Sequence, residues 1–388
     1  MSKKKLGIHT ICTHVGEIKD EQFKGAISPI YMSTSYEFDN VDIKRYPRYF
    51  NTPNQEHLSK KIAALERAES AMIFGSGMAA ISHMFLAFLQ KGDHLVVQNT
   101  LYGGTSNFIR EEFHKYGIEY TFTNSHKEAD FIAAIRPNTK VIHIETPSNP
   151  LLTITDIKAI ASLAKSKGII TTIDNTFASP VNQNPLDLGI DIVMHSATKY
   201  LGGHSDILAG AVAGSKDHID RIWNVSKNLG GSLSDMTVWL LERSMKTLAL
   251  RVKSQTKNAK KLAKFLNKHS DVTKVYYPGL KSHPEHELAK SQMHDFGAMI
   301  SFELANGIDA MAFQKQLHLI KSSMSLAGVE STMLLPSETS HALLTQEQRD
   351  AVGISDRLIR FSVGIENYKD LKKDIEQAIT KTKVAAFA

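Results

Sequence analysis

A lysine stands among two hydroxyl side chains and two glycines in the segment SATKYLGGHS, which follows the apolar run DIVMH. This order places Lys199 just beyond the end of a buried strand. A partly desolvated lysine has a lowered pKa and can attack a carbonyl carbon. A lysine at a strand end can also do no more than extend its amine into water. The position of Lys199 alone therefore fits both a reactive amine and a solvated one, and the neighbouring residues are needed to distinguish them.

Groups suited to a phosphate and to a ring nitrogen occur in the same part of the sequence. Ser196 and Thr198 provide hydroxyl donors, and Gly77 and Met78 provide backbone N–H groups at the start of a predicted helix. Asp174 ends the strand-like run GIITTID, where its carboxylate could pair with a protonated ring nitrogen. A lysine, a phosphate cradle and an acid together are what pyridoxal 5'-phosphate (PLP) requires.

The elements that must position these residues alternate between short β-rich runs and helical segments. HLVVQ, KVIHIE and GIITTID are predicted strands, and helices are expected near residues 106–115 and 154–167. This alternation predicts an α/β fold with a mostly parallel sheet and helices on both faces. Ligands of such sheets bind beyond the carboxyl ends of the strands, where these polar residues occur.

The chain is predicted to divide into three parts. Residues 1–55 are rich in turns and are interpreted as an N-terminal arm, followed by a large domain over residues 56–250. The segment after residue 235 is helical without proline or glycine and leads into a smaller α/β domain over residues 251–388. GAMISFEL and LIRFSVG are predicted strands of that domain.

Composition narrows the class of protein. Of 388 residues, 42% are hydrophobic and 22% charged, as in an ordinary soluble globular protein. A net charge of +6 is attributed to solvated faces, so no nucleic-acid partner is expected. Cys12 is the only cysteine, which excludes a disulfide within the chain and favours a cytoplasmic location. The uncharged stretch 71–89 is broken by glycines, so a buried helix is expected rather than a membrane span.

The segment HSATKYLGGHSD closely resembles the PLP-lysine signature of the Cys/Met-metabolism, or transsulfuration, family of PLP-dependent enzymes. The similarity runs nearly end to end and includes FGSGMAAI, LYGGT, ETPSNP, DNTFASP, SLAGVES and LIRFSVGIE. It implies a large domain of the aspartate-aminotransferase-like type (fold type I), a smaller C-terminal domain and an N-terminal arm.

The resemblance also implies roles for individual residues around the cofactor. Lys199 matches the lysine that binds PLP and acts as a base, and Asp174 matches the acid beside the ring nitrogen. Tyr102 matches the tyrosine that stacks on the ring and moves protons, and Asn149 a residue near the phenolic oxygen. The phosphate binders are matched by Gly77, Met78, Ser196 and Thr198.

Further matches concern the substrate and a neighbouring subunit. Arg360 matches the arginine that binds the substrate α-carboxylate, and Ser325 a residue that helps to position it. Glu330 matches a glutamate that meets the distal amino group, although a surface carboxylate is an equal alternative. Tyr46 and Arg48 match a pair that reaches the phosphate of the neighbouring subunit, which implies a homo-oligomer, at least a dimer and usually a tetramer.

Some positions depart from the family pattern. In the arm, where Y-x-R-x-x-N-P-T is usual, the proline after Asn51 is displaced by one position, which leaves the shape of the loop 46–54 open. Gly104 replaces the cysteine typical of methionine γ-lyases, and Ala327 replaces a common glycine. The segment His283–Glu287 contains histidines and glutamates, but its match implies no metal.

These observations predict a PLP enzyme that performs γ-elimination or γ-replacement on cystathionine or another homoserine-derived amino acid. Methionine γ-lyase and cystathionine β-lyase activities are alternatives within the family. An aminotransferase is disfavoured by the SATKYLGGHSD and SLAGVES matches. A relative that binds PLP without catalysis would be expected to lack Lys199, Asp174 or Arg360, and all three are present.

Overall fold

The structure is a computed structural model that describes residues 6–339, 345–351 and 353–386. The first five residues of the predicted arm lie outside these ranges. The chain forms two compact units, of which the first comprises Met1–Asn99, Gly104–Glu145 and Thr155–Leu250 and the second Thr100–Gly103, Thr146–Ile154 and Arg251–Ala388. Within the described ranges, none of the helices combines the length and the apolar character that crossing a bilayer requires.

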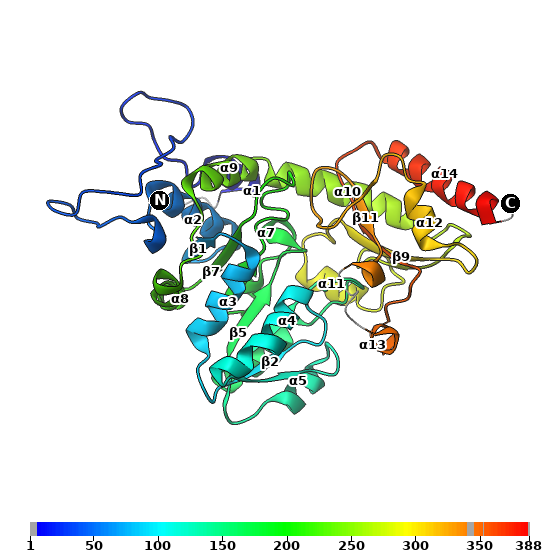
Figure 1. Cartoon of the computed structure of the whole chain (residues 1–388), viewed down its shortest axis with the longest axis horizontal. Coiled ribbons are helices and arrows are strands. Elements are labelled where there is room, and N and C mark those ends of the chain that lie inside the picture. Colours follow the sequence, from blue (N-terminus) through cyan, green and yellow to red (C-terminus); the bar gives the residue numbers. More distant parts are fainter. Residues whose placement is uncertain (1–5, 340–344, 352, 387–388) are drawn as a thin grey trace. The chain divides into compact units, whose positions relative to one another are not determined.

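The first unit is built on a seven-stranded sheet with the order β1-β7-β6-β5-β4-β2-β3 (Figure 1). Its strands are β1 (Ser70–Phe74), β2 (His94–Val97), β3 (Glu119–Phe122), β4 (Thr139–Glu145), β5 (Ile170–Asp174), β6 (Ile192–His195) and β7 (Gly210–Gly214). Strands β2 to β6 pair in parallel, whereas β7 is antiparallel to both β1 and β6. The prediction of a mostly parallel sheet is therefore confirmed.

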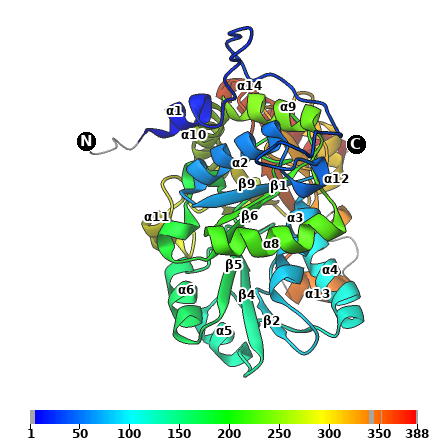
Figure 2. The same ribbon diagram turned by 90° about the vertical axis from the view of Figure 1, so that its left-hand side faces the viewer.

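Helices cover this sheet because their apolar stripes match its buried strands. They are α1 (Ile8–His14), α2 (Pro53–Glu66), α3 (Gly77–Phe88), α4 (Gly103–Glu112), α5 (Glu128–Ala134), α6 (Ile157–Ser166), α7 (Ser179–Asn182), α8 (Lys216–Leu229) and α9 (Asp235–Met245). Ile157 and Ile160 of α6 join Ile142, Ile173 and Val193 of the strands in one buried cluster. Helix α3 lies beside α8, and α2 packs on β1 (Figure 2).

Local signals set the starts of the two helices nearest to the predicted site. Ser76 caps α3 by accepting a hydrogen bond from the N–H of Ala79 at 3.0 Å. Thr52 caps α2 in a reciprocal arrangement with Gln55, and Pro53 occupies the first helical position, which tolerates proline because its missing N–H is not needed there. The displaced proline of the arm thus opens α2.

The second unit contains a five-stranded sheet with the order β10-β11-β12-β9-β8. Its strands are β8 (Val272–Tyr276), β9 (Met299–Leu304), β10 (Lys321–Ser322), β11 (Thr332–Leu334) and β12 (Leu358–Ser362). The helices that follow α9 are α10 (Leu248–Leu266), α11 (His286–Gln292), α12 (Ala310–Lys315), α13 (Gln346–Ala351) and α14 (Tyr368–Ala386). The predicted strands GAMISFEL and LIRFSVG contain β9 and β12, which pair antiparallel.

Candidate active site

The predicted site residues form groups that each lie within one unit. The first unit carries Gly77, Met78, Asp174, Ser196, Thr198 and Lys199, together with the arm residues Tyr46 and Arg48. The second unit carries Tyr102, Asn149, Ser325, Glu330 and Arg360.

Asp174 ends β5 as a buried carboxylate with 8% of its surface exposed. Its Oδ1 accepts a hydrogen bond from the N–H of Thr176 at 2.9 Å. Burial raises the pKa of Asp174, and this rise is opposed by hydrogen bonds from Thr176 and by the charge of His195. A buried carboxylate is stabilised as an anion by a cationic partner, so this position suits a protonated ring nitrogen.

The turn after β6 carries the predicted cofactor lysine. The N–H of Ser196 donates to Thr176 Oγ1 at 2.8 Å, which links the end of β6 to the residues that follow β5. The N–H of Lys199 donates to the Ser196 carbonyl at 3.1 Å, and the side chain of Lys199 is half-buried. The hydroxyl of Thr198 donates to the carbonyl of Ala209 at 3.1 Å. To bind a phosphate as predicted, this hydroxyl must rotate its O–H away from that carbonyl.

Gly77 allows the N-terminus of α3 to approach this turn. A Cβ at Gly77 would lie 2.9 Å from Ser196 Cβ, 3.0 Å from its Oγ and 3.1 Å from its Cα. The first N–H groups of α3, at Gly77 and Met78, therefore start next to the Ser196 hydroxyl. Free N–H groups at a helix start beside a hydroxyl form a site for a phosphate. Together with Asp174 and Lys199, the residues of this unit fit PLP.

Arg360 on β12 is the centre of the second group. Its guanidinium is buried, with 6% of the residue exposed, and donates to Asn149 Oδ1 and to the Ser325 carbonyl, each at 3.0 Å. Burial lowers the pKa of Arg360 to about 10, and Tyr102 opposes this shift. Among the residues that the structure describes, no carboxylate forms an ion pair with this guanidinium. The structure thus brings together Arg360, Asn149 and Ser325, three residues for which the resemblance implies roles in the site.

The loop Ser325–Ser331 carries two predicted substrate residues, Ser325 and Glu330. Ser325 and Ala327 have φ values of +76° and +67°, in the left-handed region that favours glycine. The loop is held there by specific bonds, since the N–H of Ala327 donates to Ser362 Oγ at 2.7 Å. Ser331 donates to the carboxylate of Glu366 through its N–H at 2.6 Å and its hydroxyl at 2.9 Å.

The arm residues lie together at an exposed site. The guanidinium of Arg48 is 5.3 Å from the ring centroids of Tyr46 and Tyr49, and it also donates to the carbonyl of Lys227. Tyr46 is 41% exposed. The turn Pro47–Tyr49 is a short 3₁₀ helix that ends at Phe50 with a φ of +58°. This is the shape of the loop that the displaced proline had left open.

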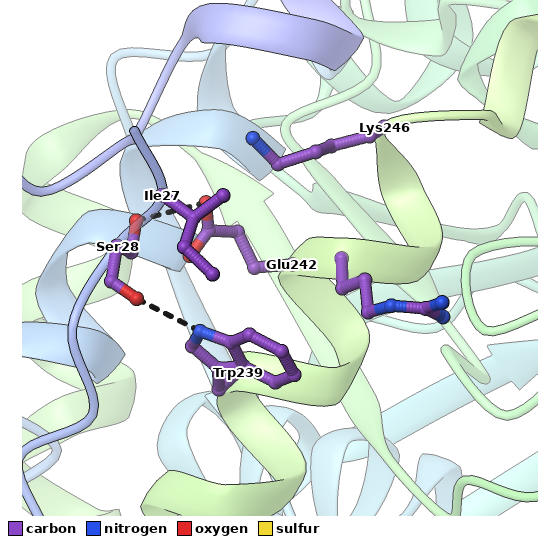
Figure 3. A pocket seen from close by; sticks show the side chains of 6 residues that line it. Ile27, Ser28, Trp239, Glu242 and Lys246 are labelled. Carbon is purple, nitrogen blue, oxygen red and sulfur yellow. Dashed lines mark hydrogen bonds between the residues drawn. The ribbon is translucent and has the colours of Figure 1, made fainter. Parts of the chain in front are cut away.

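A separate cavity of about 110 Å³ lies where the arm meets α9 (Figure 3). It is lined by Ile27, Ser28, Trp239, Glu242, Arg243 and Lys246, and no predicted site residue is among them. Trp239 Nε1 donates to the Ser28 carbonyl at 2.9 Å, and Ser28 Oγ donates to Glu242 Oε1 at 3.1 Å. Burial raises the pKa of Glu242, while Ser28 and the lysines nearby oppose this rise. These bonds anchor the arm.

Sequence reasoning missed some contributors to the first group. Thr176 positions both Asp174 and Ser196, and its signal was available in the polar triplet that follows β5. His195 ends β6 and is buried, so its ring needs a hydrogen-bond partner. The structure supplies that partner as Glu66, for which the sequence contains no signal.

The α/β fold is typical of a PLP-dependent enzyme, and so is a site with a lysine, an acid and groups suited to bind a phosphate. The Cys/Met metabolism PLP-dependent enzyme family matches residues 9–380, and the chain belongs to that family. It is 43% identical to the cystathionine gamma-lyase of Bacillus subtilis, over 98% of this chain and 99% of that protein. It is 42% identical to a cystathionine beta-lyase of Lactococcus lactis, over 94% and 97%.

Solved structures agree with this assignment. The crystal structure of cystathionine gamma-lyase from Lactobacillus plantarum complexed with L-serine is 40% identical in sequence and superimposes with a TM-score of 0.93, covering 97% of this chain and 100% of that one. The expected fold class is confirmed, and PLP is the cofactor that the family implies.

Proposed function

We propose that the chain catalyses γ-elimination or γ-replacement on cystathionine or another amino acid derived from homoserine. The observation that carries this proposal is the buried guanidinium of Arg360, whose described partners are neutral oxygens. A buried cation without a paired anion favours an anionic ligand, and a carboxylate accepts two parallel N–H bonds from arginine. The α-carboxylate of an amino acid meets this requirement.

The residues of the first unit are assigned to the cofactor. PLP, when bound, supplies a ring that absorbs the electrons released when substrate bonds break. Lys199 would hold the cofactor through its amine and, whenever that amine is free, could act as the base that takes the proton from Cα of the substrate. It would have to give up that proton before taking a second one from Cβ. Asp174 keeps the proton on the ring nitrogen, because a nearby carboxylate favours the cationic form. The phosphate is assigned to the N–H groups of Gly77 and Met78 and to the hydroxyls of Ser196 and Thr198.

The residues of the second unit are assigned to substrate orientation and proton delivery. Arg360 fixes the α-carboxylate, and Ser325 positions it through the same loop. Asn149, which accepts from Arg360, is assigned to the phenolic oxygen of the cofactor. Glu330 is assigned to the distal amino group of cystathionine. Tyr102, which is 51% exposed, is assigned to stacking on the cofactor ring and to protonating the leaving sulfur.

The cofactor assignment is tested by colour and by trapping. Purified protein incubated with PLP is expected to develop a visible absorption band, and borohydride is expected to attach the cofactor to Lys199. The Lys199→Ala variant is the control and is expected to show no adduct at position 199. Wild-type protein that stays colourless and yields no adduct would contradict the proposed function.

A second candidate is cystathionine β-lyase, because relatives named γ-lyase and β-lyase match this chain at 43% and 42% identity. Methionine γ-lyase activity is the third, although Gly104 stands where a cysteine is typical. A substrate panel separates them: cystathionine, methionine, cysteine, and O-acetyl-, O-succinyl- and O-phosphohomoserine with cysteine. The γ-lyase is expected to form 2-oxobutanoate and cysteine from cystathionine, the β-lyase pyruvate and homocysteine, and the γ-synthase cystathionine from an activated homoserine. An aminotransferase would release no ammonia.

The arm supports a proposal about assembly. We assign Tyr46 and Arg48 of the arm (residues 1–55) to the phosphate bound by the large domain (residues 56–250) of a neighbouring copy, while the small domain (residues 251–388) supplies Arg360. The minimal active unit is then a dimer, and a tetramer is the expected state. Mixing Arg48→Ala and Lys199→Ala subunits should restore about a quarter of the sites if pairing is random. No recovery at all would argue against shared sites. The single cysteine supports a cytoplasmic location.

A further inference from the structure

A buried carboxylate at the end of α2 contacts the ends of two strands of the sheet. Glu66 is 1% exposed, and its Oε1 lies 2.5 Å from His195 Nε2. The same oxygen accepts a hydrogen bond from Asn175 Nδ2 at 3.0 Å. One carboxylate oxygen therefore joins a residue at the end of β5 to a residue at the end of β6.

The two partners of Glu66 are the direct chain neighbours of predicted cofactor residues. Asn175 follows Asp174, and His195 precedes Ser196. Each partner of Glu66 therefore shares a peptide bond with a residue that is assigned to PLP. A displacement of Asn175 or His195 thus moves the carboxylate or the hydroxyl that is assigned to PLP.

Further bonds make this arrangement stiff. Asn175 Nδ2 also donates to the carbonyl of Gln183 at 3.0 Å, and Gln183 Nε2 donates back to Asn175 Oδ1 at 2.9 Å. The side-chain amide of Asn175 is therefore held by three hydrogen bonds, two donated by Nδ2 and one accepted by Oδ1. The backbone N–H of Asn175 donates to the carbonyl of Met194 at 3.0 Å, which continues the pairing of β5 with β6 by one residue.

Stability alone is a weak explanation for this cluster. His195 is 2% exposed and Asn175 is fully buried, so the polar groups of all three residues are removed from water. Glu66 Oε2 is buried and has no hydrogen-bond partner among the residues that the structure describes. Well-packed apolar residues would avoid the desolvation that a buried polar cluster requires. The cluster instead holds two strand ends in a defined register.

We propose that Glu66 is a positioning residue for the cofactor site: through Asn175 and His195 it fixes Asp174 and Ser196 relative to each other. This proposal rests on the proposed function, because it assumes that Asp174 and Ser196 bind PLP. It assigns no contact between Glu66 and the cofactor.

The test compares PLP binding by the full-length chain carrying Glu66→Ala or Glu66→Gln. Glu66→Ala removes both accepted bonds, and PLP is expected to bind at least about tenfold more weakly, with a shifted visible band. Glu66→Gln retains an oxygen that accepts from both partners, so its dissociation constant is expected within about threefold of the wild-type value. This rescue by the amide separates positioning from a general loss of structure.

His94→Ala provides a matched control, because His94 is also a fully buried polar side chain of the first unit but lies at the start of β2, where its ring contacts the hydroxyls of Thr139 at 2.8 Å and Thr121 at 2.9 Å. It is expected to lower the melting temperature without changing the affinity for PLP or the visible band. The increase in melting temperature on saturation with PLP is recorded for every variant. This increase should be smaller for Glu66→Ala than for His94→Ala.

Two results would overturn the proposal: wild-type affinity in Glu66→Ala, or an equal loss of affinity in Glu66→Ala and His94→Ala. If Glu66→Ala is not recovered in folded form, the PLP affinity of His195→Phe is compared with that of the control instead. This variant keeps a ring but removes the nitrogen that contacts Glu66. A failure of the proposed function looks different, since the wild-type chain would then not bind PLP or would yield no borohydride adduct at Lys199.

Discussion

The close approach of α3 to Ser196 predicts that Gly77→Ala will disturb the phosphate site. The added Cβ would lie 2.9 Å from Ser196 Cβ and 3.1 Å from its Cα, whereas carbon atoms in contact normally lie roughly 3.5–4.0 Å apart. One contact is a backbone atom, so rotation of the Ser196 side chain cannot relieve the overlap. The start of α3 and the turn after β6 must therefore separate by roughly 0.5 Å or more.

The size of the effect follows from opposing terms. Adding a methyl group to a filled space costs typically about 1–3 kcal/mol, and alanine in place of glycine in a helix returns at most about 1 kcal/mol. The free energy of unfolding should therefore fall by about 1–2 kcal/mol. If the separation breaks one hydrogen bond to the phosphate, which is worth about 1.5–3 kcal/mol, PLP should bind roughly 10–100-fold more weakly.

The assay is an absorption titration of the full-length variant with PLP, together with its thermal melting with and without the cofactor. Gly75→Ala is the matched control from the same loop. Its Cβ would lie 3.5 Å from the Gly231 carbonyl oxygen and 3.6 Å from that of Ser232, which are ordinary contacts. This control is expected to melt within about a degree of the wild type and to bind PLP equally well.

Wild-type affinity for PLP in Gly77→Ala, or an equal loss in both glycine variants, would refute this reasoning. Either result would mean that the space between α3 and the Ser196 turn yields without displacing the groups assigned to the phosphate.

Three further predictions concern the substrate group and a buried histidine. Arg360→Lys loses the two parallel N–H bonds to a carboxylate, so KM for the amino-acid substrate should rise roughly 10–100-fold. An unchanged KM would contradict the assignment. Glu366→Ala removes the carboxylate that accepts both hydrogen bonds from Ser331, so it should loosen the loop Ser325–Ser331 and raise KM for the substrate about tenfold. A KM equal to that of the wild type would show that these two bonds do not hold the loop. Burial lowers the pKa of His143 to about 3 from 6.5, so the unfolded chain takes up a proton below pH 6.5 that the folded chain resists until about pH 3. The corresponding stability is present above pH 6.5 and falls with the pH, by about 2 kcal/mol at pH 5. The His143→Gln variant lacks this group, so its free energy of unfolding should fall between pH 7.5 and pH 5 by about 2 kcal/mol less than that of the wild type, as measured by denaturant titration. Equal falls in the two proteins would disprove the attribution to His143.

Much of the fold could be predicted because it depends on local patterns. The buried helix predicted within the stretch 71–89 is observed as α3 over Gly77–Phe88, and the run KVIHIE is observed in β4 over Thr139–Glu145. Alternation of apolar runs with turn residues is sufficient to identify such elements. The helical segment after residue 235 is interrupted between Met245 and Leu248, where 3₁₀-type bonds close the last turn of α9. No proline or glycine marks this break.

The candidate cofactor residues could also be predicted, because the topology of a parallel sheet brings strand ends to one edge. Asp174 and Ser196 follow adjacent strands, and their predicted proximity required only the order of those strands. The antiparallel insertion of β7 between β1 and β6 was not predicted, because an all-buried run such as AGAVAG is compatible with either direction.

The sequence by itself determined the α/β class and the family, and it predicted the lysine and the acid at the strand ends as cofactor residues. The tertiary structure alone decided which residues far apart in the sequence meet within each unit. Glu66 is 129 positions from His195, and Arg360 is 211 positions from Asn149. Hydrophobic periodicity shows which face of a helix or strand is buried, but it does not show which residue of a remote element packs against that face. The burial of Arg360, which lowers its pKa, depends on such contacts between remote elements.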